Sequence, residues 1–210
     1  MDAAAFFDAA QDYGFTDLSN DTLLRALQGS VDSIERMRPW PFLEAVATLT
    51  FAGASGTPVT APPRLRAMLR AKDLAAGTRP KPIRLDDFED MVGTSYDEAG
   101  NPRVYFMQAG VLNFWPLPPS STTIRVLFLQ FSARLTETSV EADFLITARH
   151  WEAILFGMLR RLYDQQDDPE LAATMAQQRD QLVSDMVEDL MKWQFDEPDF
   201  VRLTDPEDWY

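Results

Sequence analysis

The chain of 210 residues contains no cysteine and a single histidine, His150. The absence of cysteine excludes disulfides, thiolate nucleophiles and zinc sites built on Cys ligands, and it is compatible with a reducing compartment. A Ser-His-Asp triad or a multi-His metal site would have only His150 to use. Because no partner residue stands near it in the sequence, we interpret His150 as structural and expect no catalytic residue, no metal and no cofactor.

Basic residues and long apolar runs are also scarce. The chain has 19 Lys and Arg against 33 Asp and Glu, a formal net charge of -14. That balance repels nucleic acid and disfavours sequence-specific DNA binding. No apolar run approaches the ~20 residues needed to span a bilayer, and residues 1–10 have no basic n-region. We therefore expect a protein that is soluble and not secreted, with no membrane partner.

The N-terminal part has the pattern of two helices. Residues 2–13 predict a short helix that ends at Gly14, and Ser19 is expected to cap a second helix. Apolar residues recur in that second helix at spacings of four, four and three, at Leu23, Leu27, Val31 and Ile34. This spacing places them on one face, which requires a packing partner.

The C-terminal part predicts two more helices. The first covers residues 148–163, and Asp168 with Pro169 is expected to begin the second, as N-cap and first helical residue. The apolar stripe of the first is Trp151, Ile154, Leu155, Met158, Leu159 and Leu162. The stripe of the second is Leu171, Met175, Leu182, Met186 and Leu190. Both stripes fit a period of 3.6 residues.

Residues 44–136 have a different pattern, with short β-branched and aromatic segments separated by Gly and Pro. We expect an antiparallel three-stranded meander over residues 103–131, with a tight reversal at 108–110 and a longer one at 116–121. Its last strand has apolar side chains on both faces, which predicts a central or doubly covered strand. Residues 67–74 fit either a strand or a helical turn.

Four carboxylates stand together at Asp86, Asp87, Glu89 and Asp90. Carboxylate oxygens are ligands for Ca²⁺ or Mg²⁺, but this group lacks the alternating spacing and central glycine of a calcium loop. A short helix with Asp86 as N-cap and Glu89 in capping-box position explains them more simply.

These patterns predict an α+β fold. The helical bundle comprises residues 1–43 and 143–192, a β-rich antiparallel domain of residues 44–136 is inserted into it, and residues 193–210 form an extended acidic, aromatic C-terminal tail. The tail carries six carboxylates and two prolines, a composition typical of segments that order on a partner.

Two groups of residues are candidate partner interfaces. The first is the tail group, Trp193, Phe195, Phe200, Arg202, Trp209 and Tyr210. The second is the densest basic group of the chain, at Arg64, Arg66, Arg70 and Lys72. The basic group fits an acidic surface on a neighbouring copy, or phosphate. A solvated strand edge, on which basic residues discourage pairing with other strands, fits it equally well.

The order of these elements resembles the head-to-tail adaptor proteins of tailed bacteriophages, and through them tail tubular protein A of short-tailed phages. The resemblance covers about residues 20–192 and is one of pattern and order. It rests on four stretches: "MRPWPFLEA", the short helix "LDDFEDM", "GNPRVYFMQAGVLNFWPLPPSSTTIRVLFLQF" and "TARHWEAILFGMLRRLYDQQDDPELAATMAQQRDQL". It implies a structural virion protein, not an enzyme, located in the neck between capsid and tail and made in the host cytoplasm. Its implied partners are other copies in a dodecameric ring, the portal protein and a downstream tail or nozzle protein. DNA would pass through the ring without sequence-specific binding.

Three alternatives remain open. An acidic protein without an active site could imitate DNA, although its carboxylates are scattered and not in rows. Another tail or connector component fits the same pattern. A hydrolase with an unrecognised site would have only His150 and carboxylates to use.

Overall fold

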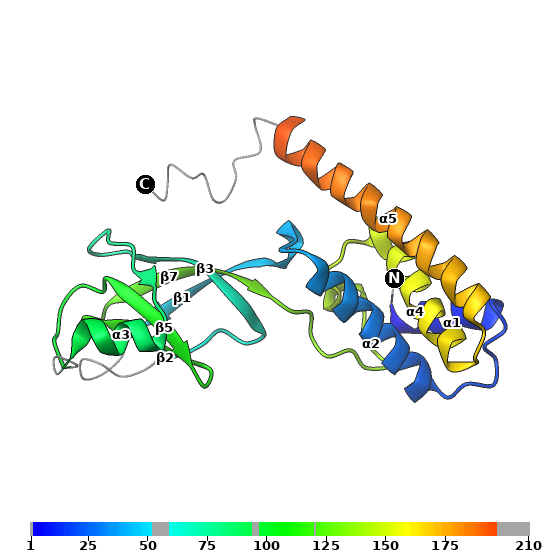
Figure 1. Cartoon of the computed structure of the whole chain (residues 1–210), viewed down its shortest axis with the longest axis horizontal. Helices are drawn as coiled ribbons and strands as arrows, with labels where there is room; N and C mark the ends of the chain where they lie inside the picture. The colour runs from blue at the N-terminus through cyan, green and yellow to red at the C-terminus, as the bar shows by residue number, and fades with distance from the viewer. Residues whose placement is uncertain (1, 52–58, 94–96, 120, 197–210) are drawn as a thin grey trace. The chain divides into compact units, whose positions relative to one another are not determined.

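The computed structural model of this chain describes residues 2–51, 59–93, 97–119 and 121–196, with side chains of the last helix described as far as residue 190. Helices and sheets both contribute, so the fold is α+β, as predicted (Figure 1). The chain forms two compact units. The helical unit contains the described residues of 2–43 and 131–196, and the β unit contains the described residues of Glu44–Gln130.

The helical unit is built around α4. Its helices are α1 (Ala3–Asp12), α2 (Asn20–Met37), α4 (Trp151–Gln165) and α5 (Pro169–Asp196). Short 3-10 turns lie at Pro41–Leu43, Glu141–Asp143 and Ala148–His150. α4 packs against α1, α2 and α5. Fully buried side chains from these helices and their connections include Phe6, Phe15, Leu23, Leu27, Ile34, Ile154, Met158, Leu159 and Leu162.

The predicted helix ends are confirmed at three places. Ser19 caps α2, because its hydroxyl accepts from the backbone N–H of Thr22 at 3.3 Å. Asp168 caps α5 by accepting from the N–H of Leu171 at 3.1 Å. Gly14 has φ +95, the left-handed conformation that ends a helix at least cost for glycine.

The predicted stripe of α5 is wrong in part. Leu171 is 41% exposed, whereas the buried side chains among residues 169–190 of this helix are Ala172, Met175, Val183 and Met186. The period of 3.6 residues lets two neighbouring stripes fit the same sequence, and packing on α4 selects the one that contains Ala172. α5 also continues to Asp196, so the first four residues of the expected tail, 193–196, have helical backbone.

The β unit consists of two sheets and one helix. The first sheet has the order β1-β7-β3, formed by β1 (Glu44–Thr50), β7 (Thr123–Gln130) and β3 (Leu65–Asp73). The second has the order β2-β6-β5-β4, formed by β2 (Val59–Thr60), β6 (Val111–Trp115), β5 (Val104–Gln108) and β4 (Lys81–Pro82). All pairings are antiparallel except that of β4 with β5. Residues 67–74, whose sequence fitted either a strand or a helical turn, belong mostly to strand β3.

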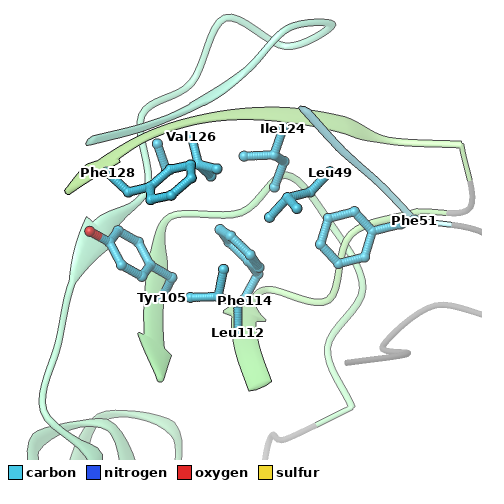
Figure 2. Close-up of a cluster of buried hydrophobic side chains, with 9 residues drawn as sticks. Leu49, Phe51, Tyr105, Leu112, Phe114, Ile124, Val126 and Phe128 are labelled. Atoms are coloured by element: carbon cyan, nitrogen blue, oxygen red, sulfur yellow. The ribbon is translucent and has the colours of Figure 1, made fainter. Parts of the chain in front are cut away.

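An apolar core joins the two sheets (Figure 2). Ile124, Val126 and Phe128 extend from one face of β7 toward Tyr105, Leu112 and Phe114 of the second sheet, and Leu49 and Phe51 complete the cluster. Phe51 and Phe114 meet edge to face at 5.5 Å between ring centroids, a favourable aromatic geometry. The sheets of this unit are therefore held together by side chains that alternate along their strands.

The expected three-stranded meander is wrong. β5 and β6 do form a hairpin, closed by Ala109 and Gly110 with φ values of 50 and 78. After β6, however, the chain leaves that sheet, and β7 lies between β1 and β3 in the other one. The apolar residues on both faces of β7 had predicted a central strand, and this position satisfies that prediction.

The start of α3 (Leu85–Val92) also differs from the prediction. Arg84 is the N-cap residue and makes no side-chain cap hydrogen bond, so Asp86 lies inside the first turn and is not the cap. Asp86 and Asp87 still stabilise this helix, because carboxylates favour the positive end of the helix dipole. Phe88 holds the helix on the second sheet through a ring contact with Phe106 at 4.6 Å.

Candidate interaction surfaces

The predicted basic group lies along one edge of the first sheet. Among the residues that the structure describes, β3 pairs only with β7, and it is therefore an edge strand. Arg66 and Arg70 lie on it, and Arg64 directly precedes it with φ 61. Arg64 and Arg70 are exposed, while Arg66 is half-buried and makes a further contact. The structure thus brings the three predicted arginines together on a single strand edge.

A further basic strand position, which sequence reasoning missed, extends this group onto the outer face of the sheet. Arg125 of β7 lies directly opposite Lys72 of β3, and Arg70 lies opposite Leu127 two residues further along β7. The three cations share the face that points away from the core cluster, because Ile124, Val126 and Phe128 occupy the other face. Strand alternation could have revealed Arg125. Arg125 and Lys72 therefore place two basic side chains directly opposite each other on this face.

The predicted tail residues cannot be placed as a site. Trp193 and Phe195 lie on the backbone of α5, and their side chains are outside the described part of the chain. Phe200, Arg202, Trp209 and Tyr210 lie outside the described residues.

His150 lies at the junction between the 3-10 turn Ala148–His150 and α4. Burial lowers its pKa, the nearby Asp189 carboxylate raises it, and Arg149 lowers it. Arg149 forms an ion pair with Asp189 at 3.1 Å. A lowered pKa favours the neutral imidazole, which suits a half-buried residue at a helix start.

The carboxylates of α3 do not form a metal site in the structure. In the described ranges, no group of three or more His, Cys, Asp or Glu side chains is arranged to hold a metal ion. The described helices also include none that is long and apolar enough to cross a bilayer.

A second basic group, which sequence reasoning missed, surrounds a cavity in the helical unit. Arg160 and Arg161 of α4 and Arg179 of α5 line it, together with Ser30 and Ser33 of α2, Gly157 and Asp164. The cavity volume is about 130 Å³. Arg179 occupies the buried face of α5, with only 11% of its side chain exposed. An arginine at a position where the helical period predicts an apolar residue was the available sequence signal.

Comparison with known families defines the class: the chain is a phage head-to-tail adaptor, a structural component of the virion neck that takes part in tail assembly. A family model matches residues 1–200, so the chain belongs to the SU10 adaptor protein family. No curated protein matches this chain.

Proposed function

We propose that this chain assembles as a ring beneath the portal, extends the DNA channel and docks the next tail component, without enzymatic activity. The observation that carries the proposal is the family match over residues 1–200. The dodecameric state and the relation to tail tubular protein A are part of the same proposal.

A charge argument supports ring formation. Neighbouring copies in a cyclic ring meet through two different surfaces, which must be complementary. The chain carries a net charge of -14, yet Arg70, Lys72 and Arg125 gather on one sheet face. A basic face of one copy can therefore meet acidic surface of the next, whereas most other pairings between copies would bring like charges together.

The same charge balance supports a channel function. DNA that moves through a protein ring must not be held by it, and an acidic chain repels the phosphate backbone. In this proposal the basic outer face of the first sheet contacts protein and does not line the channel. Arg64, Arg66 and Arg70 are then residues of an interface between proteins, and the tail group of residues 193–210 is a second one.

Mixing the chain with the portal protein of the same phage tests the proposal. Mass photometry is expected to show discrete complexes that contain the portal and multiple copies of the chain. Replacing Arg125 by Glu is expected to weaken assembly, while the matched change Arg25→Glu, on the exposed part of α2, is expected to have little effect. Failure to bind the portal under any salt condition would contradict the proposal.

A further inference from the structure

The cavity between α2, α4 and α5 has the charge and the fixed geometry of a binding site. Its three arginines come from two helices, and two serines from α2 complete its wall. All of these residues belong to the helical unit. The surrounding chain is strongly acidic, so a convergence of three guanidinium groups on one hollow is unusual for it.

Close helix packing fixes the walls. A Cβ atom on Gly157 would lie 2.2 Å from the Ser30 hydroxyl oxygen, so α4 approaches α2 as closely as glycine permits. The Ser30 hydroxyl donates to the Ile154 carbonyl at 2.7 Å, which ties the same two helices. The Arg161 guanidinium lies over Gly29, where an added Cβ would be 2.9 Å from it. The arginines Arg160 and Arg161 are therefore carried by a helix that is packed closely against α2.

The charges around the cavity do not balance. Arg160 pairs with Asp164 at 3.6 Å, and Arg179 pairs with Asp180. Within the described part of the chain, no hydrogen bond or ion pair engages the guanidinium of Arg161. Three cations and two anions leave one positive charge, and the Arg161 fork can bind a carboxylate through two parallel hydrogen bonds. One unit of charge in a space of about 130 Å³ matches a single carboxylate better than a nucleic acid backbone.

We propose that this cavity is a carboxylate-binding site, and that its ligand is an acidic side chain from residues 197–210 of a second copy of this chain. That segment contains Glu197, Asp199, Asp205, Glu207 and Asp208 against one arginine. Between copies that each carry a charge of -14, such a pairing offsets repulsion at the point of contact. This inference rests on the proposed function, because the ring would hold a neighbouring copy close to the cavity at high local concentration.

The distance along α5 favours a neighbouring copy over the same chain. Residue 196 lies 17 positions beyond Arg179, which corresponds to about 26 Å of helix. A segment that leaves the far end of α5 would have to reverse along that whole length to reach its own cavity. We therefore assign the acidic segment to another copy, whose approach to the cavity is not limited by this length of helix.

A peptide titration tests the site independently of ring formation. A fluorescent peptide of residues 197–210 is added to the full-length protein, and binding is followed by anisotropy. We expect saturable binding that weakens about tenfold in Arg161→Gln, because a charge-assisted hydrogen bond is lost. Arg25→Gln, which changes net charge equally on the exposed part of α2, is the matched control and is expected to leave affinity unchanged.

Three results would overturn the assignment. A peptide in which all five carboxylates are replaced by amides must bind more weakly, and equal binding would exclude carboxylate recognition. Equal weakening by Arg161→Gln and Arg25→Gln would show only general charge attraction. Competition by inorganic phosphate at the same concentration as unlabelled peptide would show an unselective anion site. Peptide binding by a chain that never assembles on a portal would instead contradict the proposed function alone.

The absence of cysteine permits a direct test of which copy supplies the ligand. One chain carries Ser33→Cys at the cavity, and another carries Thr204→Cys in the acidic segment. After mixing on the portal complex and oxidation, we expect a cross-linked pair of chains, more abundant than with Gln177→Cys on the exposed face of α5. In a chain that carries both cysteines, a predominantly internal cross-link would overturn the assignment to a second copy. If assembled rings gave no more cross-link from Ser33→Cys than from Gln177→Cys, the assignment of the cavity as the binding site would be overturned.

Discussion

Arg179 and Glu35 are charged residues on helix faces that the hydrophobic period marks as buried. Glu35 is fully buried on α2, beside Ile34 of the predicted stripe. Its carboxylate accepts from the Ser132 backbone N–H at 3.1 Å and from the Ser132 hydroxyl. The Ser132 oxygen accepts in turn from the Leu145 N–H at 3.2 Å. Hydrophobic periodicity located the buried faces, but it could not reveal the Glu35 network, because the partner Ser132 lies 97 residues away in the sequence.

Replacing Glu35 by Ala is expected to reduce the free energy of unfolding by about 2–4 kcal/mol, because it leaves the buried Ser132 N–H without its acceptor and opens a cavity. Chemical denaturation of the two proteins measures the change. Glu188→Ala, on the exposed face of α5, is the control and is expected to stay within about 0.5 kcal/mol of the parent. Similar losses for both variants would show that the Glu35 network contributes nothing special.

The close contact between α2 and α4 predicts different effects for alanine at two glycines, Gly157 and Gly29. Gly157→Ala is expected to destabilise the protein by about 1–3 kcal/mol, because the new methyl group overlaps Ser30. Gly29→Ala meets only the guanidinium at the end of the long Arg161 side chain and gains helix propensity, so it is expected to be neutral or stabilising by up to about 1 kcal/mol. Thermal unfolding distinguishes them, and adding Ser30→Ala to Gly157→Ala should recover part of the loss. Equal effects at the two glycines would refute the close approach.

The lowered pKa of His150 predicts how stability depends on pH. The unfolded chain, in which this histidine has its ordinary pKa of about 6.5, binds the proton more readily than the folded chain. The contribution is therefore fully present above that value and is lost as pH falls through the folded pKa. Melting temperatures between about pH 7 and about pH 5 are expected to fall less in His150→Gln than in the parent. A steeper fall in the variant would mean that the histidine gains a proton more readily on folding.

Individual elements were predictable from local pattern, whereas their pairing was not. The alternation of apolar and polar residues predicted the strands. The apolar residues on both faces of β7 also predicted that it is a central strand. These patterns could not give the sheet in which β7 lies, because a turn at 116–121 allows either return to β6 or passage to β1 and β3. The candidate sites divide in the same way. The adjacent basic residues of β3 were visible in the sequence, but the arginine cavity depends on the packing of α2, α4 and α5.

The uncapped start of α3 provides a test at the level of one element. Arg84 is exposed and makes no side-chain cap hydrogen bond. Arg84→Ser is expected to stabilise the helix by about 0.5–1 kcal/mol, because a serine hydroxyl can accept from a free N–H of the first turn. Hydrogen exchange of the α3 amides measures the gain. The matched change Glu89→Ser, within the helix, is expected to speed exchange, and slower exchange there would contradict the assignment of Arg84 as the cap.

At the scale of the whole molecule, the family, the charge and the surfaces support one account. The SU10 adaptor family places the chain in a phage neck. The basic sheet face and the arginine cavity are two local exceptions in a chain of charge -14. We propose both as binding sites for acidic protein surface. Stable subunit contacts in such an assembly need interfaces well above the size of crystal contacts. The account therefore predicts a closed ring of copies and not a single bound molecule.

Cryo-electron microscopy of the neck in purified virions tests this central claim most directly. The account predicts a ring of this chain immediately below the portal, enclosing a channel continuous with the portal channel. It also predicts protein, not DNA, against the outer face of the first sheet. A neck in which this chain is present as isolated copies, or encloses no channel, would contradict the account.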